Sequence, residues 1–118
     1  MNINRFCSLK ALTLATLLEV ACLAPAISAA GETKSALTYN NGAFEPATLT
    51  VAANEPVKLT VTNTSDAAIE FESFELNRER VVLPGKTIVV LLPKLEPGEY
   101  HFFDDFHRDR SQGTITVR

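Results

Sequence analysis

Hydrophobic and polar residues alternate over several short stretches of the chain, as they do in strands that bury one face. The stretches with this alternation are residues 48–51, 57–62, 69–72 and 114–117. Residues 87–92 instead form a continuous apolar run rich in β-branched side chains, which predicts a strand buried on both faces. Residues 100–103 form a further short strand candidate.

Turn-forming residues separate these stretches, which predicts tight connections between neighbouring strands. They lie at residues 40–42, 54–56, 63–66, 84–85 and 97–98. Residues 75–80 fit either one helical turn or an irregular crossover, and no convincing amphipathic helix or internal repeat is visible. The pattern predicts an all-β fold, a Greek-key β-sandwich of about 7–8 strands in one domain.

The first thirty residues differ from the rest and have the organisation of a signal peptide. Arg5 and Lys10 give a positive start, and an apolar stretch follows at residues 11–27. Small side chains then lead to a cleavage point near Ala29 or Ala30. We therefore expect residues 1–30 to be removed, residues 31–118 to form the domain, and the protein to be periplasmic without a transmembrane segment.

Both cysteines, Cys7 and Cys22, lie in the segment that we expect to be removed. A lipid anchor on Cys22 is disfavoured because Glu19 stands where a lipidation motif requires an apolar residue. The mature chain then has no thiolate for a disulfide or a metal. It carries 9 basic and 13 acidic residues, a net charge of −4. This balance excludes a nucleic-acid partner and suits a protein that handles cations.

Glu70 and Glu72 are two residues apart on an expected strand, so their side chains leave the same face. One interpretation is that ordinary surface charges alternate outward on a half-solvated sheet. The other is a cation site, because two neighbouring carboxylates repel each other and a bound cation reverses that repulsion.

Asp104, Asp105 and His107 form a denser cluster, with phenylalanines at positions 102, 103 and 106 around it. These residues are either turn formers that cap backbone N–H groups or metal ligands, because carboxylates beside apolar groups need a partner. Carboxylates with one imidazole suit Fe²⁺, Fe³⁺, Mn²⁺ or Cu²⁺ and are poor ligands for Cu⁺. Zn²⁺ also binds Asp and His, and the spacing does not exclude it.

Three segments in order resemble the cupredoxin family, which implies the same sandwich fold. They read FEPATLTV at residues 44–51, VTNTSD at residues 61–66 and PGEYHF at residues 97–102. The resemblance places Glu70 and Glu72 near the first copper ligand, Asp104 at the cysteine ligand and His107 at the second histidine. A blue-copper centre is therefore excluded, since its character depends on a copper–thiolate bond.

The combination of EFESFELNRER at residues 70–80 with FFDDFH at residues 102–107 resembles a narrower group. This group is the periplasmic cupredoxin component of bacterial ferrous-iron uptake (FtrB-type, related to the EfeO cupredoxin domain). The resemblance implies that iron is the bound metal, with copper as a second candidate. It also implies a membrane iron permease and other exported uptake components as partners, and a ferroxidase-type activity whose turnover stays open. The alternatives are a metal-free interaction module and a copper carrier.

Overall fold

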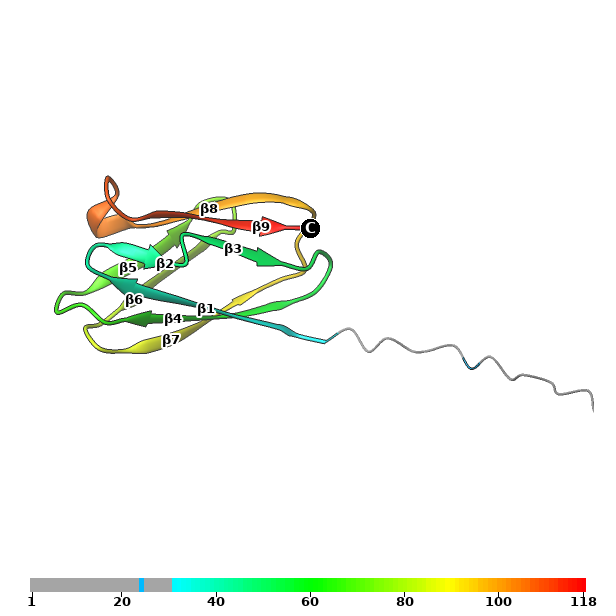
Figure 1. Cartoon of the computed structure of the whole chain (residues 1–118), viewed down its shortest axis with the longest axis horizontal. Coiled ribbons are helices and arrows are strands. Elements are labelled where there is room, and N and C mark those ends of the chain that lie inside the picture. Colours follow the sequence, from blue (N-terminus) through cyan, green and yellow to red (C-terminus); the bar gives the residue numbers. More distant parts are fainter. Residues whose placement is uncertain (1–23, 25–30) are drawn as a thin grey trace, which may run out of the picture.

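In the part of the chain that the computed structural model describes, nine β-strands form two sheets that pack face to face (Figure 1). The structure describes Ala24 and residues 31–118. The predicted signal peptide, its cleavage point and both cysteines therefore lie outside the described residues. The predicted all-β sandwich is confirmed, and residues 31–118 contain nine strands in place of seven or eight.

The strands are short, and a single 3₁₀ turn is the only helical element within residues 31–118. The elements are β1 (Thr33–Asn40), β2 (Ala43–Glu45), β3 (Thr48–Val51), β4 (Val57–Asn63), β5 (Ile69–Ser73), β6 (Arg78–Val82), β7 (Thr87–Leu92), β8 (Gly98–Asp104), η1 (Asp105–His107) and β9 (Gln112–Val117). No helix in the described part of the chain has the length and apolar character needed to cross a membrane.

The order of strands brings distant parts of the sequence together. One sheet has the order β2-β1-β4-β7 and the other has the order β3-β9-β8-β5-β6. The pairs β1–β4 and β3–β9 are parallel, and the remaining pairs are antiparallel. The last strand, β9, thus lies between β3 and β8, inside its sheet.

The core follows the predicted alternation most clearly along β4 and β5. In β4 every second residue, from Val57 to Asn63, is buried, and the residues between them are partly exposed. In β5 the same pattern buries Phe71. The Phe71 ring stacks on Phe102 from β8 at 5.5 Å between centroids, and Phe44 meets Phe102 edge-on at 5.2 Å. These aromatic rings join the two sheets, because β2 belongs to one and β5 and β8 to the other.

Two expectations for strands were wrong or incomplete. We predicted that residues 87–92 are buried on both faces, but Val89 and Leu91 in β7 are 46% and 60% exposed. These two side chains alternate with the buried Val90 and Leu92, so they lie on the outer face of the edge strand β7. Residues 75–80 form neither a helical turn nor a crossover, since β6 begins at Arg78 and pairs with β5 as a hairpin.

The predicted turns occur where the backbone needs unusual conformations. Asn41 and Gly42, between β1 and β2, have φ of +49° and +81°, the signs of a tight hairpin turn. Gly85, between β6 and β7, has φ of +69°, which glycine tolerates without strain. These φ values explain why asparagine and glycine occupy the turns.

Candidate functional site

Three carboxylates meet on the outer face of the five-stranded sheet. Glu70 and Glu72 leave β5 on the side opposite the buried Ile69 and Phe71. Asp105 opens η1 directly after β8, which is paired with β5. Ligand oxygens of these three partly buried acids all lie within 4.8 Å of one another. Among the described residues, no other group of three or more Asp, Glu, His or Cys side chains meets that criterion.

The acids raise each other's proton affinity. Partial desolvation raises the pKa of Glu70, and the negative charges of Glu79, Asp105 and Glu72 raise it further. The pKa of Glu72 is also raised by desolvation first and then by Asp105 and Glu79. Glu79 is the cross-strand partner of Glu72 in the β5–β6 hairpin, so a fourth carboxylate borders the cluster. Negative charge is therefore in local excess at this face.

One cation from the chain itself reaches the cluster. The Arg108 guanidinium donates to the Asp105 carboxylate three residues before it. It also lies over the rings of Phe74 and Phe103, at 5.8 and 5.3 Å from their centroids. The positive charge of Arg108 lowers the pKa of Glu72, although this effect is smaller than the raising effects. Arg108 therefore offsets part of the negative charge at Asp105 and Glu72.

Substituting Glu70 with glutamine is expected to raise the melting temperature of the metal-free protein at pH 7. The pKa of Glu70 is raised above its ordinary value of 4.5 in the folded state. The unfolded chain therefore loses this proton first, and the folded protein loses stability as pH rises from about 4.5 through the raised pKa. The gain from Glu70→Gln should vanish at pH 4, where wild-type Glu70 is mostly protonated in both states. Thermal unfolding in EDTA at pH 7 and at pH 4 measures this change in melting temperature. Glu99→Gln on β8 is the matched control. An equal or lower melting temperature of Glu70→Gln at pH 7 would contradict the repulsion.

Asp104 lies apart from these three acids, although it is next to Asp105 in sequence. Because Asp104 is paired with the buried Phe71, it points into the sandwich and is completely buried. Its Oδ1 accepts hydrogen bonds from the backbone N–H groups of Glu70 and Phe106, at 2.9 and 3.1 Å. Its Oδ2 lies 2.6 Å from Nδ1 of His107. The chain itself thus supplies the partners that this carboxylate needs.

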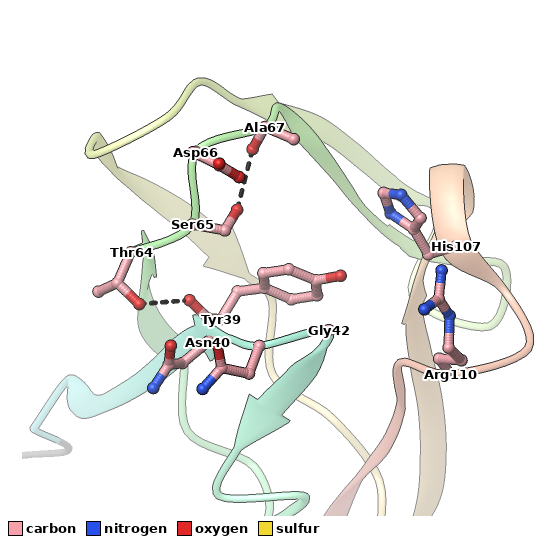
Figure 2. Close-up of a pocket in the computed structure, with 10 residues that line it drawn as sticks. Tyr39, Asn40, Gly42, Thr64, Ser65, Asp66, Ala67, His107 and Arg110 are labelled. Carbon is pink, nitrogen blue, oxygen red and sulfur yellow. Dashed lines mark hydrogen bonds between the residues drawn. The ribbon is translucent and has the colours of Figure 1, made fainter.

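His107 is oriented by Asp104 rather than by the three outer acids. With Nδ1 on Asp104, its other ring nitrogen is left for the surroundings, and 36% of the side chain is exposed. His107 borders a pocket of 480 Å³ that is also lined by Tyr39 and Arg110 (Figure 2). Burial raises the pKa of Tyr39, and the Asp104 carboxylate near the Tyr39 hydroxyl raises it further, to about 12. The five predicted ligands therefore divide into an outer trio and an inner Asp–His pair.

Sequence reasoning gave little weight to several residues that shape these sites. Glu79 is not among the five predicted ligands, but it borders the acidic trio. The spacing of Asp105 and Arg108, three residues apart in a short helical turn, was the signal for their ion pair. Tyr39 gave no signal, because its place beside Asp104 depends on the pairing of distant strands.

Comparisons with known proteins agree with this architecture. The family model described as "Cupredoxin-like domain" matches residues 11–117. A relative by sequence is an uncharacterised protein of Rickettsia prowazekii (strain Madrid E), 38% identical over 81 residues. The alignment covers 69% of this chain and 65% of that protein, less than two thirds of its length.

Solved structures with the same fold include two proteins described by their copper chemistry. Auracyanin A, a "blue" copper protein from Chloroflexus aurantiacus, matches 75% of this chain and 100% of its own, with a TM-score of 0.60 and 17% identity. The metal-binding domain of the Cu(I)-exporting ATPase CopA from Streptococcus pneumoniae D39 matches 75% and 97%, with a TM-score of 0.62 and 15% identity. At these identities the likeness shows the shared fold alone.

Proposed function

Because this chain belongs to the cupredoxin-like domain family, we propose that it is a metal-binding protein that holds a hard cation through Glu70, Glu72 and Asp105. The observation that carries the proposal is the convergence of these three carboxylates within 4.8 Å on the outer face of the five-stranded sheet. Like charges held this close destabilise one another, and a cation bound between them reverses the effect.

The residues do not fit a blue-copper centre. Residues 31–118 contain neither cysteine nor methionine, so they offer no sulfur ligand. Asp104, which the family resemblance aligns with the cysteine, is completely buried and already bound by two backbone N–H groups and an imidazole. A copper–thiolate bond is what gives such centres their electron-transfer character. The ligands present therefore give no support to an electron-transfer role.

The outer trio fits a hard cation for reasons of charge and access. All three ligands are anionic oxygens, which Fe²⁺, Fe³⁺ and Mn²⁺ accept readily. The trio is partly exposed, so a metal ion can enter from solvent with part of its water shell. Arg108 has to release Asp105 for that carboxylate to bind fully, and its 60% exposed side chain has room to do so.

Iron is the metal we propose first, for delivery within a ferrous-iron uptake system of the periplasm. The support is the resemblance of residues 70–80 and 102–107 to the cupredoxin component of such systems, in which a membrane iron permease is the partner. Three carboxylates also bind Fe³⁺ more strongly than Fe²⁺, because the higher charge gains more from anionic ligands. Such a site lowers the reduction potential of bound iron and favours the ferric state.

Titration calorimetry of the purified protein under anaerobic conditions tests this proposal. We expect Fe²⁺ to bind with a Kd tighter than about 0.1 mM. The double variant Glu70→Gln, Glu72→Gln removes two of the three ligands and should weaken binding by about 100-fold or more. Separate titrations with Mn²⁺, Zn²⁺ and Cu²⁺ rank the metals.

The matched control is Glu45→Gln, Glu99→Gln, which removes the same charge from exposed positions on β2 and β8. This control should keep the wild-type affinity within about twofold, since distant surface charges contribute little. If neither wild type nor control binds any of these metals more tightly than about 0.1 mM, the proposed site does not exist.

A metal-free interaction module is the second candidate function. The observation that favours it is the exposure of Phe74 and Phe106, at 65% and 50%, on the segments that carry Glu72 and Asp105. Exposed aromatic side chains beside charged groups are common at protein interfaces. A protein of this kind would show no metal-dependent rise in melting temperature, whereas the metal-binding function requires one.

A further inference from the structure

The polar pocket beside His107 lies at one end of the sandwich and uses none of the three outer carboxylates. It opens between the β1–β2 turn, the loop that joins β4 to β5, and the loop that follows η1 (Figure 2). Its volume of 480 Å³ is in the range of pockets that hold small molecules. The pocket is therefore a candidate binding site that is separate from the metal site.

Opposite charges line this pocket from different loops. His107 ends η1 and Arg110 comes from the loop after it, while Asp66 comes from the β4–β5 loop on the other side of Tyr39 (Figure 2). Within residues 31–118, neither the Arg110 guanidinium nor the Asp66 carboxylate takes part in an ion pair. Both charges thus remain free to meet a ligand.

Hydrogen bonds that are buried or partly buried hold both walls in place. Asn63 is completely buried, and its Nδ2 donates to the carbonyls of Ala67 and Val82 at 2.7 and 3.0 Å. Its Oδ1 accepts from the Ser65 backbone N–H at 3.0 Å, which fixes the loop that carries Asp66. On the other wall, the Ser111 hydroxyl donates to the His107 carbonyl at 2.9 Å. A ligand therefore enters a site whose backbone is already ordered, which reduces the entropy lost on binding.

We propose that this pocket binds a small zwitterion whose carboxylate pairs with Arg110 and whose ammonium group pairs with Asp66. A guanidinium matches a carboxylate through two parallel hydrogen bonds. A simple anion would lie opposite the Asp66 charge, and a simple cation would lie opposite Arg110. A molecule with both charges, such as an amino acid, meets a partner on each wall.

Calorimetry in EDTA with a series of linear amino acids, from glycine through 4-aminobutyrate to 6-aminohexanoate, tests the proposal. We expect one chain length to bind best, with a Kd below about 1 mM. Butyrate and butylamine are the matched single-charge probes for 4-aminobutyrate, as are the corresponding compounds for each other length. These probes should bind at least about tenfold more weakly, because each leaves one charge of the pocket without a partner.

Arg110→Gln and Asp66→Asn should each weaken binding of the preferred amino acid by about tenfold or more. Arg80→Gln, on the edge strand β6, removes the same charge outside the pocket and should leave binding unchanged. Binding of no amino acid below about 1 mM, or equal binding of the acid that lacks the amine, would overturn the proposal. Neither result affects the iron titration, since EDTA removes metal and the variants spare the three outer carboxylates.

Discussion

Replacing Gly113 with alanine is expected to destabilise the fold by about 3 kcal/mol or more, which lowers the melting temperature by about 12–24 °C. Gly113 lies in β9, where a Cβ atom would overlap Cζ of Phe102 and stand 2.8 Å from the carbonyl oxygen of Ala47. The Phe102 ring cannot move away easily, because it packs against Phe44 and Phe71 in the core. The Ala47 carbonyl is also held, as it accepts the Thr114 backbone N–H at 2.8 Å.

Chemical and thermal unfolding followed by circular dichroism measures this loss. The matched control is Gly31→Ala, since no atom lies within 4 Å of the Cβ that alanine would add there. The control should change the free energy of unfolding by less than about 0.5 kcal/mol. If Gly113→Ala is as stable as this control, the close packing of Phe102 against β9 is wrong.

Replacing Asp104 with alanine is expected to destabilise the fold by about 3–5 kcal/mol. The substitution leaves the backbone N–H groups of Glu70 and Phe106 without their acceptor and frees the His107 ring. It also opens a space in a completely buried position. Since Glu70 and Phe106 belong to different segments, Asp104 joins β5 to η1, and its loss should loosen the loop that carries Asp105.

Urea unfolding of wild type, Asp104→Ala and Asp104→Asn measures this role. Asparagine keeps the shape and one acceptor oxygen, so Asp104→Asn should lose less free energy than Asp104→Ala. The neighbouring Asp109→Ala removes an acid from an exposed position and should stay within about 0.5 kcal/mol of wild type. A loss of less than about 1 kcal/mol for Asp104→Ala would show that the buried carboxylate does not hold the loop.

Local patterns in the sequence were enough to predict the class of the fold and part of the candidate site. The alternation over residues 69–72 predicts that Glu70 and Glu72 share one face, and the structure places them so. By contrast, β1 and β6 escaped prediction because their patterns are weak. Buried positions occur only in the second half of β1, and β6 carries charged side chains on an exposed edge.

Other features depend on long-range pairing, which alternation does not report. Asp104 and Asp105 are adjacent acids, and only the register of β8 against Phe71 decides that the first points inward. The apolar run of β7 looks like a strand in the middle of a sheet. Its place at the edge follows from the order of the strands, and Leu91 lies on the outer face of the sheet, between the buried Val90 and Leu92.

The position of β9 between β3 and β8 has a consequence for the growing polypeptide. β3 (Thr48–Val51) pairs with residues 114–117 of β9, which are synthesised more than sixty residues after β3. Until then, the five-stranded sheet lacks an inner member and β3 has no neighbour in it. Nascent chains of this protein should therefore stay open to proteases and chaperones almost until translation of β9 is complete.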